Sequence, residues 1–207
     1  DIDFATPLRP EAVTGRLEAA GLKAVPTGLE HGTVTAVAEG RGFEVTTFRA
    51  DVETFGRHAV VAFTEDMAED AARRDFTMNA LYADAEGDVL DPIGGLPDLQ
   101  ARRVRFIGRA EDRIREDYLR ILRFFRFSAW YAEGPLDPEG LAASAALAEG
   151  IEALARERIG QEIRKLLAAP DPACAVAAMA EAGVLARCLP GADAAALPAL
   201  LALEAAA

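Results

Sequence analysis

The feature that most constrains the fold of this chain is a change in the spacing of its apolar residues near residue 110. Before that point, short runs alternate between apolar and polar residues, which is typical of half-buried strands. Beyond it, apolar residues recur every three or four positions, as they do along one face of a helix. The sequence therefore predicts an α/β front half followed by an all-α back half.

The front half is predicted to begin with one helix and three strands. Residues 9–20 place Val13, Leu17 and Ala20 on one helical face, and Gly21 is suited to end that helix. Strand-like runs follow at residues 23–26, 32–38 and 42–49, with a hairpin turn at residues 40–42. We expect five side chains of these strands to be buried: Val34, Val37, Phe43, Val45 and Phe48.

Two further segments of the front half have less regular patterns. Residues 51–71 include an acidic stretch from Glu65 to Asp70 and are predicted to form a loop. Residues 75–83 are predicted to begin a helix, with Leu81 and Tyr82 facing the interior.

The composition fits a folded protein of one or two small domains. Hydrophobic residues make up 51% of the 207 residues, and no apolar run approaches the length of a membrane span. We therefore expect a cytoplasmic protein that does not enter membranes. Cys174 and Cys188 lack metal-ligand spacing and are expected to be buried free thiols. The oligomeric state is left open.

The net charge of −12 is distributed unevenly along the chain. Residues 101–126 hold nine arginines against four acidic residues, a local charge of +5, so the rest of the chain carries −17. A basic stripe on an acidic body can still contact phosphates. An arginine-rich solvated helix face would look the same, so charge alone leaves both interpretations open.

Covalent catalysis finds no support in the residue pattern. His31 and His58 have no obvious triad partner, and no glycine-rich phosphate-binding loop is present.

Three acidic residues are candidates for a metal site. Asp1 and Asp3 are two apart, so on a strand their side chains point to the same face. Glu44 alternates with Phe43 and Val45 and could bring a third carboxylate beside them. Mg²⁺ prefers such oxygen ligands, and carboxylate-bridged metals are one standard way to transfer nucleotidyl groups. A turn or a solvated strand edge is the alternative for so short a pattern.

A second candidate site lies in the run Arg73-Arg74-Asp75. Arg74 can reach a triphosphate and Asp75 a ribose hydroxyl, and Asn79 is four residues further along the same predicted helical face. Asp75 is also a plausible helix N-cap, so an arginine–aspartate surface pair that caps a helix is an equal alternative.

A third candidate site is the pair Asp117 and Arg120, three residues apart on a predicted helix. A carboxylate accepts from the exocyclic amine of C or A, and a guanidinium donates to ring nitrogens or carbonyls, so the pair could read these bases and reject G and U. Arg123 and Arg126 continue the stripe and could hold phosphates or the base. By itself, an i,i+3 salt bridge on an amphipathic helix is the simpler interpretation.

The order of these motifs carries more information than any one of them. The chain closely resembles the class II tRNA nucleotidyltransferase and bacterial poly(A) polymerase family through seven blocks: DIDFAT, HGTV, FEVTTFR, RRDFTMNALY, DPIGGLPDL, RVRFIG and EDYLRILRFFRF. The resemblance is dense from residue 1 to about 131 and looser from 132 to 207, where residues 157–162 resemble the family's next helical block.

The resemblance implies roles for the front-half residues. Asp1 and Asp3 match the family's metal-binding carboxylates, and Glu44 matches a third acidic position. Arg74 and Asp75 match the motif that holds triphosphate and ribose.

It implies roles for later residues too. Residues 91–98 match a motif linked to movement between head and neck. Asp117 and Arg120 match the pair that selects CTP and then ATP without a nucleic-acid template. Arg123 and Arg126 match further nucleotide contacts.

By the same resemblance, residues 1–107 form a nucleotidyltransferase head with a mixed sheet, 108–169 a helical neck that selects nucleotides, and 170–207 the start of a helical body. The family's Gly-Gly turn and arginine before the first carboxylates are absent from this sequence, and so is most of the body and tail that grip tRNA. We therefore expect a fragment that lacks the N-terminal part of the head and could be inactive alone.

The expected function is template-independent addition of C and A to the 3′ end of tRNA, from CTP and ATP, with Mg²⁺ as cofactor. One alternative in the same family is a poly(A) polymerase or an enzyme that adds only A. A second, from another class, is a non-catalytic module that binds RNA or nucleotides.

Overall fold

The computed structural model describes residues 3–28, 31–55 and 58–204. The chain divides into two compact units, Asp1–Arg74 and Asp75–Ala207. Phe76, Val104 and Phe106 pack in one core with the helices that follow them, so residues 75–107 belong to the second unit. The boundaries expected near residues 107 and 169 do not coincide with this division and stay predictions.

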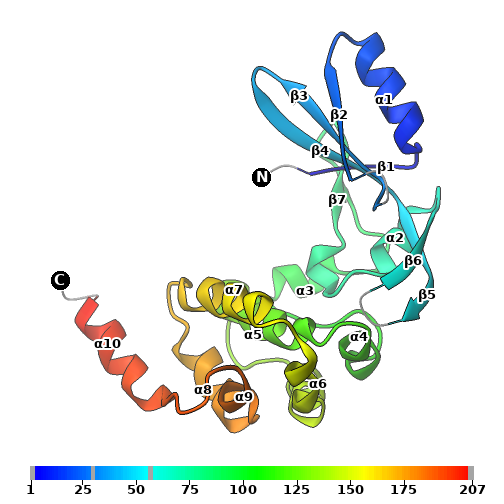
Figure 1. Cartoon of the computed structure of the whole chain (residues 1–207). Coiled ribbons are helices and arrows are strands. Elements are labelled where there is room, and N and C mark those ends of the chain that lie inside the picture. Colours follow the sequence, from blue (N-terminus) through cyan, green and yellow to red (C-terminus); the bar gives the residue numbers. More distant parts are fainter. Residues whose placement is uncertain (1–2, 29–30, 56–57, 205–207) are drawn as a thin grey trace. The chain divides into compact units, whose positions relative to one another are not determined.

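The first unit is built on a mixed β-sheet (Figure 1). Its strands run in the order β1-β4-β3-β2, with β1 parallel to β4 and β3 antiparallel to both of its neighbours. A separate antiparallel pair, β5 and β6, follows. The elements are β1 (Phe4–Thr6), α1 (Pro10–Ala19), β2 (Lys23–Gly28), β3 (Thr33–Ala38), β4 (Arg41–Thr47), β5 (Arg49–Phe55), β6 (His58–Phe63) and α2 (Met67–Ala72). The mixed sheet confirms the predicted α/β front half.

The main sheet has one apolar and one polar face, because successive side chains of a strand point to opposite sides. Val34 and Ala36 of β3 are buried, and their partners in register on β4 are Val45 and Phe43. Four polar residues alternate to the other face: Thr33, Thr35, Glu44 and Thr46. Of the five side chains expected to be buried, Val34 and Phe48 are buried, whereas Val37, Phe43 and Val45 are half-buried.

Helix α1 ends where the sequence predicts. Gly21 has φ of 74°, and its N–H donates to the carbonyl of Glu18, while the N–H of Leu22 reaches back to Leu17. These two bonds form a Schellman motif, in which glycine takes the left-handed conformation at low cost. Of the predicted face, Val13 is buried, but Ala20 is exposed.

The prediction of a loop at residues 51–71 is wrong. This segment forms most of β5, all of β6 and most of α2. The acidic stretch that suggested a loop belongs to the start of α2, where Asp66 accepts the N–H of Ala68 at 2.7 Å and caps the helix. Acidic side chains in a first helical turn are favoured by the helix dipole.

The second unit consists mainly of helices, which confirms the predicted all-α back half. Its elements are η2 (Thr77–Asn79), β7 (Tyr82–Ala83), β8 (Val89–Leu90), α3 (Leu96–Gln100), α4 (Ala110–Glu116), α5 (Leu119–Tyr131), α6 (Pro138–Ala146), η3 (Ala148–Ala153), α7 (Arg156–Leu167), α8 (Ala173–Glu181), α9 (Val184–Cys188), η4 (Ala194–Ala196) and α10 (Leu197–Glu204).

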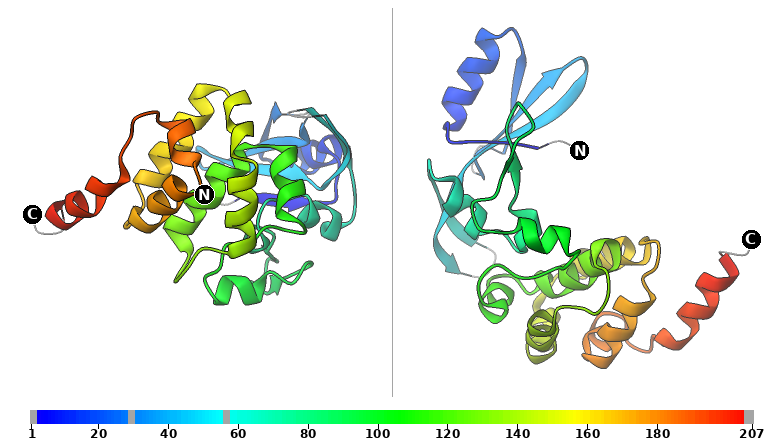
Figure 2. Two further views of the ribbon diagram at one scale, coloured as in Figure 1. Left: turned by 90° about the horizontal axis from the view of Figure 1, so that it is seen from below. Right: turned by 180° about the vertical axis from the view of Figure 1, so that it is seen from behind.

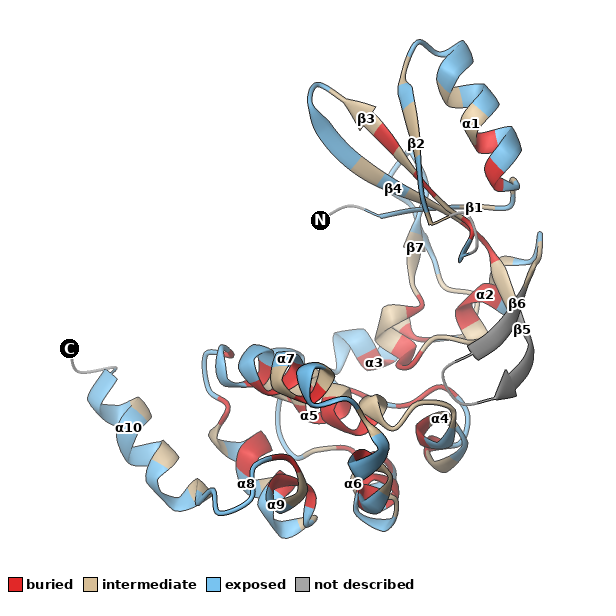
Figure 3. Cartoon of the chain, in the orientation of Figure 1, coloured by how far each residue is buried: buried red, intermediate tan, exposed pale blue. Residues whose placement is uncertain are grey.

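Helix α5 lies in the core of this unit and packs against α7 and α8 (Figure 3). Ile121, Leu122, Phe124 and Phe125 are buried, as their spacing predicts, and Phe127 is half-buried. Burying each such side chain is worth about 1.5–3 kcal/mol relative to exposing it. The position of the α5 arginines is therefore set by the apolar face of their own helix.

The helix predicted to begin in residues 75–83 is wrong in extent. Only the 3₁₀ turn η2 forms, and Tyr82 then enters the short antiparallel ribbon β7–β8. Phe76 explains the interruption, because it pairs with Phe106 in an isolated β-bridge and its side chain is fully buried. Neither Leu81 nor Tyr82 is fully buried.

Helix α10 carries no buried residue, and Leu200 and Leu203 are 51% and 70% exposed. In Figure 2 it extends away from α8 and α9. Within the described ranges, no helix combines the length and the hydropathy needed to cross a bilayer.

The two cysteines differ in exposure, which corrects the expectation that both are buried. Cys188 is buried, and burial raises the pKa of its thiol to about 11, whereas Cys174 is exposed. Since the thiolate is the reactive form, we predict that iodoacetamide at pH 8 alkylates Cys174 and spares Cys188 in the folded protein. Peptide mass spectrometry would show this, with both sites modified in urea as the control. Equal labelling of the folded protein would contradict the burial of Cys188.

Candidate functional site

Of the three predicted metal-binding carboxylates, Glu44 lies on β4, and Asp3 immediately precedes β1, the parallel neighbour of β4. The parallel pairing of β1 and β4 sets Phe4 opposite Val45. Asp3 and Glu44 each precede these residues by one position, so both point to the sheet face opposite to Phe4 and Val45. Both side chains are exposed, so their charges remain solvated. The register thus brings together two residues that are far apart in the sequence.

Asp1 lies outside the described residues. Among the residues that the structure does describe, no group of three His, Cys, Asp or Glu side chains is arranged to hold a metal ion. Asp3 and Glu44 therefore supply two carboxylates, the donor type that Mg²⁺ prefers, and the sequence expectation that Asp1 adds a third stays a prediction.

Arg74, the predicted triphosphate ligand, belongs to a cluster around Asp70. Asp70 is 2% exposed and lies on α2. Its Oδ1 accepts from Nε and Nη2 of Arg73 at 3.0 and 2.9 Å, and its Oδ2 accepts from Nη2 of Arg74 at 3.1 Å. The Arg74 side chain is 35% exposed, although its Nε is buried.

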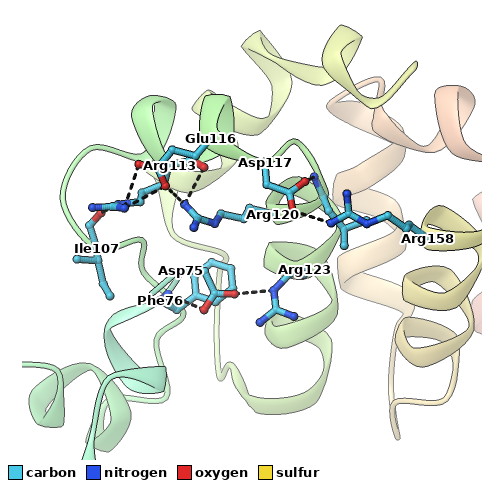
Figure 4. Close-up of polar contacts among 10 residues, drawn as sticks. Asp75, Phe76, Ile107, Arg113, Glu116, Asp117, Arg120, Arg123 and Arg158 are labelled. Carbon is cyan, nitrogen blue, oxygen red and sulfur yellow. Dashed lines mark hydrogen bonds and ion pairs between the residues drawn. The ribbon is translucent and has the colours of Figure 1, made fainter. Parts of the chain in front are cut away.

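Asp75, the predicted ribose ligand, is buried at 7% exposure in the second unit. Its Oδ1 accepts from the N–H of Phe76 and from Nδ2 of Asn79 at 3.0 Å. Its Oδ2 accepts from Nε of Arg123 on α5 at 2.6 Å (Figure 4). Asn79, expected only to share a helical face with Asp75, is therefore in contact with it, although a 3₁₀ turn and not a helix joins them. Asp75 is not the N-cap of that turn, which is Phe76.

The segment of residues 91–98 is hydrogen-bonded to the turn η2. Asp91 accepts the N–H groups of Leu96 and Gly95, and these bonds, that of Leu96 above all, lower the pKa of the Asp91 carboxyl. Asp98, 4% exposed, accepts from the hydroxyl of Thr77 at 2.8 Å. A Cβ on Gly95 would lie 2.2 Å from the carbonyl oxygen of Thr77, so only glycine fits there. The proposed link of this segment to movement stays a prediction.

Asp117 occupies the break between α4 and α5. Its backbone is extended, with φ of −153° and ψ of 110°, so it ends one helix and precedes the next. Its Oδ1 accepts the N–H of Leu119 at 3.0 Å, and its Oδ2 accepts from Nη2 of Arg158 on α7 at 2.6 Å. The side chain is 31% exposed. A carboxylate oxygen has two lone pairs, so Asp117 retains the capacity to accept from a ligand.

Arg120 has a different set of contacts (Figure 4). Its Nη1 donates to the carbonyl of Arg113 at 3.0 Å and pairs with Glu116, the last residue of α4. Glu116 also accepts from Arg113 Nη1 at 3.0 Å. Only 16% of the Arg120 side chain is exposed, so these bonds restrict the guanidinium to a narrow range of positions.

Asp117 and Arg120 are neighbours, but they do not neutralise each other. Within the described ranges, no direct ion pair joins them, which corrects the simple i,i+3 salt-bridge alternative. Each is instead fixed by a third residue, Arg158 or Glu116. A carboxylate acceptor and a guanidinium donor one turn apart can contact two adjacent positions on the edge of a base.

Arg123 and Arg126 flank the ring of Phe127, with Cζ atoms 5.2 and 4.2 Å from its centre. Arg126 donates through Nε to the buried Glu162 of α7 at 2.6 Å, and only 14% of its side chain is exposed. Arg126 thus joins α5 to α7, while Arg123, 33% exposed, joins α5 to Asp75. Their predicted contacts with a nucleotide stay predictions.

Several residues of this arrangement were missed by sequence reasoning. Glu116 and Arg113 have the i,i+3 and i,i+4 spacing of helical ion pairs, so their contacts with each other and with Arg120 were open to prediction. Arg158 and Glu162 lie in the block of residues 157–162, which the sequence marks as similar to a family helix without assigning contacts.

Two protein-family models match the chain. The model described as "Poly A polymerase head domain" matches residues 1–105, and that described as "Probable RNA and SrmB- binding site of polymerase A" matches residues 135–196. The first covers just over half of the chain.

Characterised proteins are similar over most of the chain. It is 45% identical over 170 residues to the human mitochondrial CCA tRNA nucleotidyltransferase 1, covering 81% of this chain and 39% of the human protein. It is 40% identical over 195 residues to the CCA-adding enzyme of Geobacillus stearothermophilus, covering 92% of this chain and 46% of that enzyme. The chain thus spans less than half of the length of these relatives.

Solved structures agree with this comparison. The crystal structure of the Bacillus stearothermophilus CCA-adding enzyme in complex with CTP superposes with a TM-score of 0.80 at 38% identity, covering 92% of this chain and 45% of that one. A tRNA nucleotidyltransferase complexed with a primer tRNA and an incoming ATP analogue has a TM-score of 0.76 at 24% identity, over 98% of this chain and 58% of that one, and shows the same fold.

The position of Asp117 depends on close packing beside it, which provides a stability test. A Cβ on Gly150 would lie 2.1 Å from the ring of Tyr118, the residue that follows Asp117, whereas a Cβ on Gly160 in α7 would meet no atom within 4 Å. We predict that Gly150→Ala lowers the free energy of unfolding by about 1–3 kcal/mol through overpacking. The matched control Gly160→Ala should raise it by about 0.5–1 kcal/mol through helix propensity. Urea titrations would measure both, and equal effects would contradict the close contact.

Proposed function

Since the chain belongs to the poly(A) polymerase head-domain family, we propose that its protein adds C and A nucleotides to the 3′ end of tRNA, using CTP and ATP. The observation that carries this proposal is the 40% identity to a CCA-adding enzyme over 92% of the chain. A structural neighbour at 38% identity was solved in complex with CTP, which supports CTP as one substrate.

In the proposed reaction, the oxygen of the RNA 3′-hydroxyl attacks the α-phosphorus of CTP or ATP. A new phosphodiester bond forms, the bond from the α-phosphorus to the bridging oxygen breaks, and pyrophosphate leaves while the hydroxyl proton is released. Arg74 would bind the triphosphate and Asp75 the ribose. Such catalysis consists mainly of positioning and charge neutralisation, so fixed side chains are the expected contribution of the protein.

The family is metal-dependent, and we propose Mg²⁺ as the ion. Asp3 and Glu44 fit it, because they place two hard oxygen donors on one face of the sheet, and Asp1 would add a third. When bound, Mg²⁺ would favour the ionised form of the attacking hydroxyl and offset the charge of pyrophosphate.

Base selection would fall to Asp117 and Arg120. Asp117 would accept from the exocyclic amine of C or A, and Arg120 would donate to the adjacent ring position. Their separate anchors support this proposal, since Arg158 and Glu116 hold the acceptor and the donor as two independent groups. G and U carry a carbonyl where Asp117 needs a donor, so they would be rejected.

The decisive experiment uses the full-length protein, tRNA that lacks its 3′-terminal CCA, Mg²⁺ and labelled CTP or ATP. We predict that CTP alone labels the tRNA and that ATP extends only the CC-ended product, as denaturing gels would show. Asp3→Asn and Glu44→Gln are expected to reduce the rate by several orders of magnitude. If ATP alone were used repeatedly and CTP ignored, the poly(A) polymerase or A-adding alternative would be correct. Nucleotide binding without any incorporation would support the non-catalytic module.

The selection role generates a second prediction. Asp117→Ala should reduce the preference for CTP over UTP by about 10- to 100-fold, the size of one lost base contact, while Mg²⁺ binding is unchanged. The matched control is Asp112→Ala on α4, whose carboxylate is 59% exposed and pairs with Arg115. Single-nucleotide incorporation with each triphosphate would give the kcat/KM ratios. An unchanged ratio for Asp117→Ala would refute the role assigned to it.

The cytoplasmic location expected from the sequence stays a prediction, and one of the relatives is named as mitochondrial.

A further inference from the structure

We propose that Asp70 is a positioning residue that sets the orientation of the Arg74 guanidinium for the triphosphate. This inference rests on the proposed function, because it concerns the residue proposed to bind that group. In the sequence, Asp70 ends an acidic stretch that predicts a loop. The structure instead buries it on α2, between the end of the sheet and the two arginines.

The carboxylate of Asp70 is the shared acceptor of three residues. Oδ1 accepts the backbone N–H of Arg49 at 3.0 Å and two N–H groups of Arg73 at 2.9 and 3.0 Å. Oδ2 accepts Nη2 of Arg74 at 3.1 Å. The two oxygens thus have different partners. Oδ1 binds Arg73 and the backbone at the start of β5, and Oδ2 binds Arg74.

Burial makes this arrangement rigid. The Asp70 side chain is 3% exposed, whereas those of Arg73 and Arg74 are 20% and 35% exposed. A buried carboxylate is very costly unless its hydrogen-bonding capacity is satisfied, so Asp70 cannot turn away from its donors. The bond to Asp70 therefore restricts the orientation of the Arg74 guanidinium.

The bond to Arg49 extends this effect to the sheet. Glu44 lies on β4, which ends at Thr47. Only the buried Phe48 separates the end of that strand from Arg49, the first residue of β5. Asp70 therefore fastens the helix that precedes Arg74 to the end of that strand. Phosphate-binding and metal-binding residues of the first unit are held in one frame by a residue that would touch neither ligand.

A purely structural role is the competing explanation, in which Asp70 only joins α2 to β5. The two roles differ in how Asp70 and Arg74 interact. If Asp70 acts through Arg74, then substituting Asp70 should no longer weaken nucleotide binding once the Arg74 side chain has been removed. If Asp70 only stabilises the fold, the binding free energies lost in the Asp70 and Arg74 variants should add in the combined variant.

The test is a double-mutant cycle in the full-length protein with Asp70→Asn, Arg74→Ala and the combined variant. Asp70→Asn keeps the shape of the side chain and one acceptor but removes the charge. Glu69→Gln is the matched control, because it removes the same charge from the preceding residue of α2, which is exposed and accepts from the Thr64 hydroxyl. For each variant the measurements are the Kd of CTP by equilibrium dialysis, KM and kcat for CTP and ATP, and the melting temperature.

We expect Asp70→Asn to raise the Kd of CTP and the KM of both CTP and ATP by about tenfold, as for one lost charge-assisted contact. The preference for CTP over UTP should not change, and the effect should fall below about twofold in the Arg74→Ala background. Glu69→Gln should behave as the parent protein. Tighter CTP binding, an equal loss in both backgrounds, or a change confined to one nucleotide would overturn the proposal.

Asp70→Glu covers the case in which Asp70→Asn does not fold. It keeps the charge but moves the carboxylate by one methylene, so it should also raise the Kd of CTP, and parental affinity in a folded variant would refute the positioning role. The dialysis measurement separates this inference from the proposed function. A parent protein that binds CTP but transfers no nucleotide would refute the function, while the cycle would still decide the role of Asp70.

Discussion

The ion pair between Asp75 and Arg123 is the interaction that ties the predicted ribose ligand to the helical core of the second unit. It joins the turn after Arg74 to the middle of α5, over 48 residues of sequence, at 2.6 Å. The Asp75 side chain is 8% exposed and that of Arg123 is 33% exposed, so the pair is weak evidence for added stability but a strong restriction on geometry. Because α5 is fixed by its own buried apolar face, the helical core positions one oxygen of Asp75, while the local N–H of Phe76 and the amide of Asn79 hold the other.

Pairing of a buried carboxylate with an arginine recurs through the molecule. Asp70, Asp75, Asp98 and Glu162 are buried carboxylates, and each accepts from at least one arginine. Such a carboxylate loses much more if one donor is removed than it gained from that donor, because the remaining charge stays desolvated. Arginine suits these sites because its planar group offers several donors at fixed angles. The chain thus uses structural ion pairs to orient the side chains that face solvent.

Local patterns in the sequence predicted the parts of the fold that local physics determines. The strands at residues 23–47, the hairpin at Gly40 and the end of α1 at Gly21 follow from alternation and from glycine conformation. Two segments could not be read in this way. The acidic residues before Arg73 resemble a loop in the sequence, because contacts that hold them in place involve residues distant in the sequence. Residues 75–83 do not form the predicted helix, because Phe76 pairs with the distant Phe106 in a β-bridge.

The candidate site shows the same limit. The residue types and their order predict roles for Asp3, Glu44, Arg74, Asp75, Asp117 and Arg120, because each type suits a chemical part of a nucleotide. The partners that fix them were invisible, since Asp117 meets Arg158 and Arg126 meets Glu162 at separations of 41 and 36 residues. No periodicity relates residues at such distances, so only the fold reveals them.

The register of β1 with β4 has a consequence for how this sequence can change over time. Asp3 and Glu44 share a face only because each lies one residue before the pair Phe4 and Val45. Inserting or deleting one residue inside either strand would turn its carboxylate to the apolar side of the sheet. A change of two residues would leave the carboxylate on its original side. Substitutions in these strands can therefore accumulate one at a time, but length changes are tolerated only in even steps, and surviving relatives should show that asymmetry.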